Sequence, residues 1–251
     1  SFLGFRWPFF IYGVGVALAA FVVWWQMPRV NHKQANKDKL PPMRLQEAWG
    51  DTAYRAVLTS NFAHSWINMG VRVSVLPLFA VSVFHNGAAA SGFALAVFAT
   101  GNAAVLQFSG RWADTYGRRP MILIGLVGTG LFVGLMGLAD TIPTLLVVSA
   151  FAGAASGIIN PAQTAAIGDV VGNKRSGGQV LSTFQMAGDF GQILGPIVVG
   201  GLADYFGFAK AFSVCAGVAA MGVVAWLCGR ETLQERRAIV RRIPLRKKKR
   251  L

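Results

Sequence analysis

Two apolar stretches, roughly 91–109 and 120–139, flank a short basic segment and place the strongest constraint on the fold of this chain. At 1.5 Å per residue, each stretch is long enough to cross about 30 Å of hydrocarbon as a helix. Of the 251 residues, 54% are apolar and 14% are charged, and the mean hydropathy is +0.49. This composition is too apolar for a soluble domain. The sequence therefore predicts an all-α integral membrane protein.

Apolar segments recur along the chain and predict seven transmembrane helices, at about 8–26, 53–83, 88–109, 120–139, 143–169, 177–203 and 208–229. Lys and Arg gather in alternate connections: five in 27–52, three around the fourth segment's start, two at 174–175 and ten from Arg230 onward. Because short loops rich in these residues stay in the cytoplasm, we expect a plasma-membrane protein with a cytoplasmic C-terminal tail. Anionic lipid accounts for the net charge of +14, so no nucleic-acid partner is expected.

The basic segment between the third and fourth helices carries glycines at fixed spacing, which let the backbone turn or pack closely. It resembles the cytoplasmic signature loop of the major facilitator superfamily of secondary transporters, G-x-x-x-D-x-x-G-R-(R/K). The matching residues are Gly110, Asp114, Gly117, Arg118 and Arg119. Trp112 and Thr115 stand where a small aliphatic and a basic residue are usual. The resemblance implies that this segment gates conformational exchange.

Two short stretches, 4–9 and 207–212, resemble each other and lead into the first and last helices. Members of the superfamily contain two six-helix halves related by a parallel repeat, so the resemblance implies that these seven helices correspond to helices six to twelve. The expected domains are the last helix of the N-terminal bundle (1–26), a cytoplasmic linker (27–52), the C-terminal six-helix bundle (53–229) and a basic cytoplasmic tail (230–251). The missing N-terminal bundle would lie upstream in the same chain or in a second chain.

Ionisable residues inside the predicted helices are the first candidates for function, because they are costly in lipid. Asp189 and His64 are proton-coupling candidates, and the alternative for each is a structural hydrogen-bonding role. Arg72 should face a cavity or a partner, either Asp189 or an anionic substrate. The uncharged candidates for the substrate path, any of which could instead bridge helices, are Asn68, Asn102, Gln107, Gln163, Gln185 and Gln192.

Glycine and proline residues predict close helix packing and a gate. In the fifth helix, Gly153 and Gly157 form a small-xxx-small face, and Pro161 frees a backbone carbonyl. In the sixth helix, a run resembles the antiporter motif G-x-x-x-G-P-x-x-G-G with one additional residue before its last glycines; it contains Gly191, Gly195, Pro196 and Gly200. The drug exporters carry that motif in a first-half helix, so the alternative is a kinked, tightly packed helix near the outer end.

The sequence contains no phosphate loop, metal-ligand cluster or catalytic triad spacing, so we expect no enzyme, no cofactor and no metal site. The resemblance implies alternating access around a midplane site. We predict proton-coupled efflux of drugs or small metabolites, with membrane lipid, a small-molecule substrate and the proton gradient as partners. The alternatives are a proton-coupled uptake symporter for a sugar or organic anion, and a truncated or non-transporting membrane scaffold.

Overall fold

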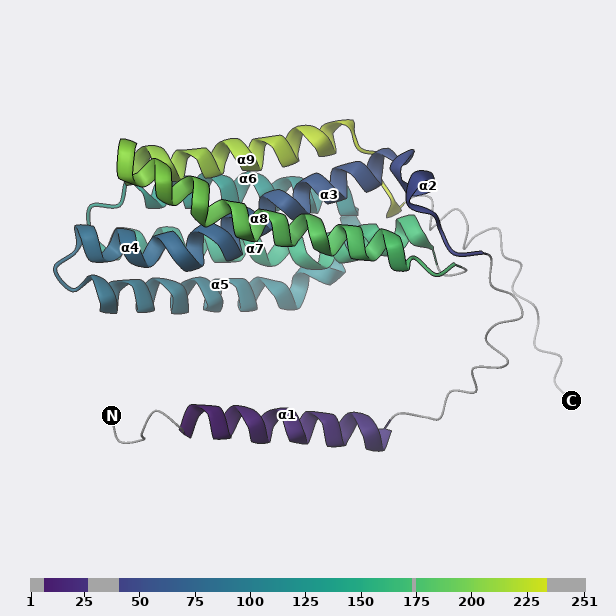
Figure 1. The fold of residues 1–251 in the computed structure, drawn as a ribbon, viewed down its shortest axis with the longest axis horizontal. Helices are drawn as coiled ribbons and strands as arrows, with labels where there is room; N and C mark the ends of the chain where they lie inside the picture. Colours follow the sequence, from purple (N-terminus) through teal and green to yellow (C-terminus); the bar gives the residue numbers. More distant parts are fainter. Residues whose placement is uncertain (1–6, 27–40, 173–174, 234–251) are drawn as a thin grey trace, which may run out of the picture. The chain divides into compact units, whose positions relative to one another are not determined.

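A computed structural model of the protein describes residues 7–26, 41–172 and 175–233, in which every regular element is a helix (Figure 1). The chain separates into two units, residues 1–40 and 41–251. Of the predicted linker 27–52 and tail 230–251, residues 27–40 and 234–251 lie outside the described residues.

The first unit contains α1, Trp7–Gln26. Its 20 residues extend about 30 Å along the helix axis. The apolar stretch within it, Tyr12–Trp25, is shorter than the spans of the second unit. Phe21 packs against two tryptophans of the same helix, with ring centroids 6.3 Å from Trp24 and 5.7 Å from Trp25.

The second unit contains six helical spans that are long and apolar enough to cross a membrane: Thr52–Val83, Gly87–Tyr116, Arg118–Met136, Ile142–Val171, Gly178–Phe206 and Phe208–Cys228. The last five are single helices, α5 to α9 in chain order. The first combines α3 (Thr52–Ser65), the π-helix η1 (Trp66–Arg72) and α4 (Val73–Val83). These spans confirm the all-α membrane fold predicted from the sequence. A short helix, α2 (Leu45–Trp49), precedes them.

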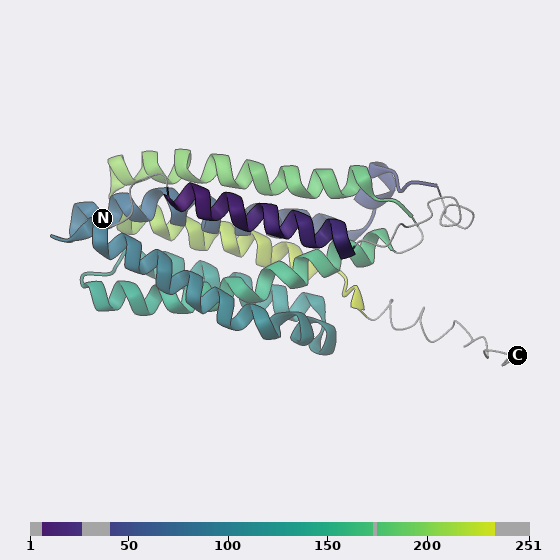
Figure 2. The same ribbon diagram turned by 90° about the horizontal axis from the view of Figure 1, so that it is seen from below.

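The six spans form a bundle in which each helix packs on two or more others (Figures 1 and 2). α5 packs on α7, α7 on α6, α6 on α9, and α9 on α3, while α8 packs on α3 and η1. The connection between α5 and α6 lies at the same end of the bundle as α2 and the end of α9, which we call the signature end.

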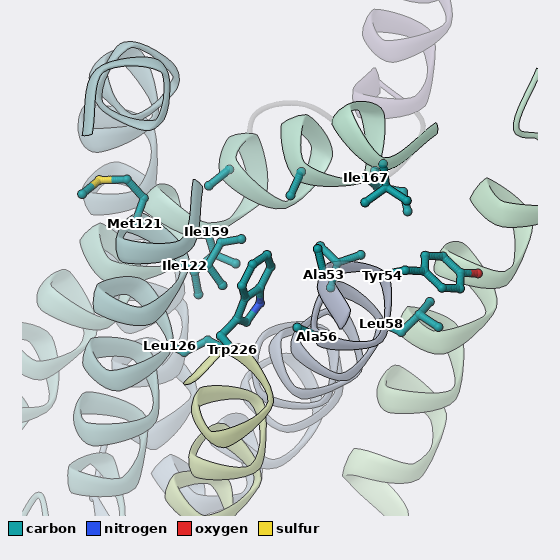
Figure 3. Close-up of a cluster of buried hydrophobic side chains, with 14 of the residues drawn as sticks. Ala53, Tyr54, Ala56, Leu58, Met121, Ile122, Leu126, Ile159, Ile167 and Trp226 are labelled. Carbon is teal, nitrogen blue, oxygen red and sulfur yellow. The ribbon is translucent and has the colours of Figure 1, made fainter. Parts of the chain in front are cut away.

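The core of the bundle near the signature end is built around Trp226 of α9 (Figure 3). Its indole ring lies beside the aliphatic side chains of Ile122 and Ile159. Its Nε1 donates to the hydroxyl of Ser60 at 3.0 Å, and Nε2 of Gln163 donates to the same hydroxyl at 2.9 Å. Gln163 is therefore buried in the core and bridges α7 to α3 through Ser60.

Glycines allow helix backbones to touch at two places. On α7, a Cβ atom at Gly153 would lie 2.1 Å from the carbonyl oxygen of Phe98, and one at Gly157 would lie 2.6 Å from that of Asn102. On α8, a Cβ atom at Gly191 would lie 2.3 Å from the carbonyl oxygen of Phe62. Since real Cβ atoms do not approach so closely, larger residues there would separate α7 from α5 and α8 from α3. Pro161 and Pro196 both lie inside helices that continue through them.

Candidate functional site

The signature segment is almost entirely helical. The sequence predicted that the third span ends near residue 109 and that a loop follows, but α5 continues to Tyr116 and α6 begins at Arg118. The connection is the single residue Gly117, with φ 116°, a backbone conformation that favours glycine. A Cβ atom at this position would also lie 2.6 Å from Oε2 of Glu231. Gly117 is thus required both for the turn and for the approach of Glu231.

Arg118 is the buried centre of an ion cluster at the signature end. Its side chain is 1% exposed and lies between two carboxylates, with Nη1 2.6 Å from Oδ1 of Asp114 and Nε 3.3 Å from Oδ2 of Asp169. The hydroxyl of Thr232 donates to the same Asp169 oxygen at 3.3 Å. This cluster joins α5, α6, α7 and the segment after α9. Gly110, the first residue of the signature, has open space around it.

Glu231 caps the first turn of α6 from a distant part of the chain. Its Oε1 accepts from the backbone N–H of Arg118 and its Oε2 from that of Arg119, both at 3.0 Å. The N–H of Leu233 also donates to Oε1 at 3.0 Å. The first N–H groups of a helix have no partner within it, and a carboxylate is favoured there. Sequence reasoning missed Glu231, although an acidic residue directly after the last span and before a basic run is a signal.

Further ion pairs and hydrogen bonds connect the elements at the signature end. Asp51 accepts from the N–H of Ala53 at 2.9 Å and from Nε and Nη2 of Arg230 at 2.8 and 2.5 Å. Burial acts to raise the pKa of Asp51, but these hydrogen bonds outweigh it and hold the pKa below its ordinary value of 3.8. Arg175 pairs with Glu47 of α2. The signature end is therefore closed by ion pairs and hydrogen bonds between helices that are far apart in the sequence.

A second set of polar residues lies along α3 and η1. Nδ2 of Asn68 lies 3.0 Å from Nδ1 of His64 and donates to the His64 carbonyl oxygen at 3.2 Å. Both side chains are buried. The structure thus pairs one proton-coupling candidate with one substrate-path candidate, inside the bundle.

Arg72 ends η1 and is half-buried. Its Cζ lies 3.9 Å above the ring centroid of Phe98 on α5. Within the described residues it makes no ion pair, so the structure does not bring it together with Asp189, the partner that the sequence suggested. Asn102, one helical turn beyond Phe98, is half-buried.

The remaining polar candidates are exposed on the bundle surface. Gln185, Asp189 and Gln192 recur at i, i+4 and i+7 along α8 and therefore share one side of that helix. A neighbouring side of α8 carries Gly188, Gly191 and Gly195, which pack against α3 and η1. Gln107 of α5 is also exposed, and Gly200 has open space around it. No cluster of three His, Cys, Asp or Glu residues that would suit a metal occurs in the described part of the chain.

Comparison with known proteins places this arrangement in a family. The chain is 27% identical to Multidrug resistance protein 2 of Bacillus subtilis (strain 168) over 67% of its own length and 43% of that protein. It is 30% identical to Multidrug resistance protein 1 of the same organism, over 64% of its length and 42% of that protein. The chain is 33% identical to Multidrug resistance protein MdtG of Escherichia fergusonii, over 63% of its own length and 40% of that protein. The chain therefore spans about two fifths of the length of these relatives.

The family model named Major Facilitator Superfamily matches residues 58–250. These residues include the signature segment, all of α5 to α9 and most of the first span of the bundle. The chain belongs to the Major Facilitator Superfamily.

Proposed function

We propose that this chain forms the second half of a proton-coupled exporter of drugs or small metabolites, which works by alternating access against a first helical bundle. The observation that carries the proposal is the polar side of α8. Gln185, Asp189 and Gln192 are exposed on one side of a membrane-spanning helix. A carboxylate facing lipid there would be costly, so this side should face a wet path or another bundle. Relatives named multidrug resistance proteins support efflux as the direction.

Asp189 is the proton-coupling residue in this proposal. It lies near the middle of Gly178–Phe206, and it makes no hydrogen bond or ion pair within the described residues. A carboxyl group of this kind can bind a proton on one side of the membrane and release it on the other, as its access to water changes. His64 is already engaged with Asn68, so it is the weaker candidate.

The ion cluster at the signature end acts as the gate in this proposal. Opening of the transporter toward the cytoplasm requires the helices at the signature end to move, and these helices are joined by Arg118, Asp114, Asp169 and Glu231. Breaking and remaking this cluster would set the rate of exchange between the two open states. The abundance of Lys and Arg at this end supports its placement in the cytoplasm.

The test is gradient-driven flux in proteoliposomes containing the native polypeptide with any sequence beyond these 251 residues. Efflux of ethidium should follow an imposed pH gradient. Asp189→Asn should abolish this dependence, because an amide cannot carry the proton. Asp204→Asn is the matched control, since Asp204 is exposed near the end of the same helix. An unchanged pH response in Asp189→Asn would remove Asp189 from the mechanism, and absence of any flux would favour a non-transporting scaffold.

A further inference from the structure

Arg72 lies within a membrane span, and no carboxylate among the described residues pairs with it. It is 20 residues after Thr52 in the span Thr52–Val83, which corresponds to about 30 Å along the helix axis. Within the described residues its Cζ lies 3.9 Å from the centroid of the Phe98 ring, and its charge also interacts with the buried side chain of His64. The Nε atom is buried and has no acceptor in that part of the chain. A buried cation in such a place normally has an anionic partner.

The geometry around Arg72 leaves its donors free for a ligand. The Cζ atom of Arg72 lies over the Phe98 ring, 3.9 Å from its centroid. The N–H donors of a guanidinium point outward in its plane, where they match the two oxygens of a carboxylate. The contact with the ring is electrostatic and does not use these hydrogen bonds. The side chain is only half-buried, so a ligand at the bundle surface can reach it.

Apolar side chains occur close to this cation in the structure and along its own element. Phe98, whose ring it contacts, is 4% exposed, and Met69, three residues before Arg72 in η1, is 52% exposed. An exposed, flexible thioether adapts to varied apolar shapes. The combination suits a molecule with one acidic group and an apolar body.

The π-helix explains why the site is found here. A π-helix widens the turn and changes the direction of the side chains that follow, and such segments often occur at functional sites. Asn68, in the same seven-residue element, also keeps a buried Oδ1 without a partner in the described residues. With Nε1 of Trp66, three buried polar atoms of this π-helix have no hydrogen-bond partner among the described residues.

We infer that Arg72, stacked on Phe98, is a binding site for the carboxylate of amphipathic organic anions, so that the substrates of this protein include hydrophobic carboxylates. The inference rests on the proposed transporter function and specifies the chemical class of its substrate. The alternative partner of Arg72 is a carboxylate of the opposing bundle. Such a carboxylate would neutralise Arg72 in every transport cycle, independently of the substrate.

Three probes with the same ring and different charge separate these possibilities: 1-naphthoate, 1-naphthamide and 1-naphthylmethylammonium. Binding to the purified native polypeptide is measured by titration calorimetry. Arg72→Gln should weaken 1-naphthoate binding about ten- to hundredfold, the range expected for loss of a hydrogen bond to a charged group. Arg72→Lys should retain part of the affinity, since it keeps the charge but loses the planar donors. Binding of 1-naphthamide should change less than twofold.

The control is Arg55→Gln, because Arg55 is an exposed arginine in the first turns of the same span. It should leave 1-naphthoate binding unchanged. Phe98→Leu should weaken 1-naphthoate binding less than Arg72→Gln, because it removes the stacking ring but leaves the charge. Equal loss for 1-naphthoate and 1-naphthamide in Arg72→Gln would overturn the inference and favour an ion pair with the opposing bundle.

Failure of the inference and failure of the proposed function give different results. If ethidium flux follows the pH gradient but the unaltered protein does not bind 1-naphthoate, the exporter proposal stands and the anion site is refuted. If 1-naphthoate binds in an Arg72-dependent manner but no probe is transported, the site stands and the exporter proposal fails.

Discussion

The contact between Glu231 and the start of α6 gives the most quantitative prediction. Replacing Glu231 with Ala removes the acceptor for the N–H groups of Arg118 and Arg119, both now bonded at 3.0 Å. Loss of a helix cap costs about 0.5–2 kcal/mol, and loss of a negative charge at a helix N-terminus costs about 0.3–1 kcal/mol more. Because Glu231 is half-buried and accepts a third bond from Leu233, we expect about 2 kcal/mol of local stability to be lost.

A local loss of this size is best measured by amide hydrogen exchange of the native polypeptide in lipid. A change of 1.36 kcal/mol is a factor of ten, so peptides covering residues 117–122 should exchange about thirtyfold faster in Glu231→Ala. Peptides from the far end of α6 should exchange at the original rate, because the first turn can open without the rest.

The matched control is Glu47→Ala. Glu47 is an exposed carboxylate at the same end of the bundle, and its partner in the structure is the surface residue Arg175. Exposed ion pairs contribute about 0–1 kcal/mol, so exchange at 117–122 should stay within twofold of the original rate. Unchanged exchange in Glu231→Ala, or equal acceleration in α3 and α9, would refute the capping argument.

Two further predictions concern the same end of the bundle. Asp114→Asn should slow transport several-fold with little change in substrate affinity, because it weakens one ion pair of Arg118 while Asp169 remains; a large affinity loss with normal turnover, measured as KM and maximal rate in proteoliposomes, would contradict this. Asp51→Asn should lower the free energy of unfolding above about pH 5. Arg230 holds the pKa of Asp51 below 3.8, so the difference in free energy of unfolding between the unaltered protein and Asp51→Asn should shrink as the pH falls through the lowered pKa. Unfolding measured from pH 6 to pH 3 checks this.

The positions of the six spans of the second unit were predictable because each needs only a sufficient run of apolar residues. At about 8–26, where the sequence predicted a seventh, the structure has α1, whose apolar stretch Tyr12–Trp25 is shorter. The end of α5 was not predicted in the same way. The apolar run of α5 stops near residue 109, but the helix continues to Tyr116. Arg111 and Asp114, in this last part of the helix, are exposed. Hydropathy therefore located the span, whereas the turn depended on the positive φ of Gly117, one residue before Arg118.

Contacts between distant residues were much less predictable. Five matching positions identified the signature segment, but nothing in its spacing indicates that Glu231, 113 residues later than Arg118, completes it. Likewise, the sequence suggested Asp189 or an anionic substrate as the partner of Arg72, since opposite charges attract. The observed partner is Phe98, one of 18 phenylalanines, and no local pattern distinguishes it from the others.

α5 connects the two candidate sites physically. Phe98 stacks on Arg72, and Asp114, 16 residues later on the same unbroken helix, pairs with Arg118. The two contacts are therefore about 24 Å apart along one continuous helix. A carboxylate bound at Arg72 does not touch the ion cluster at the signature end, yet any tilt of α5 that changes the Phe98 contact also moves Asp114. This is why a change at Asp114 should alter the rate of conformational exchange, while a change at Arg72 should alter which ligand is bound.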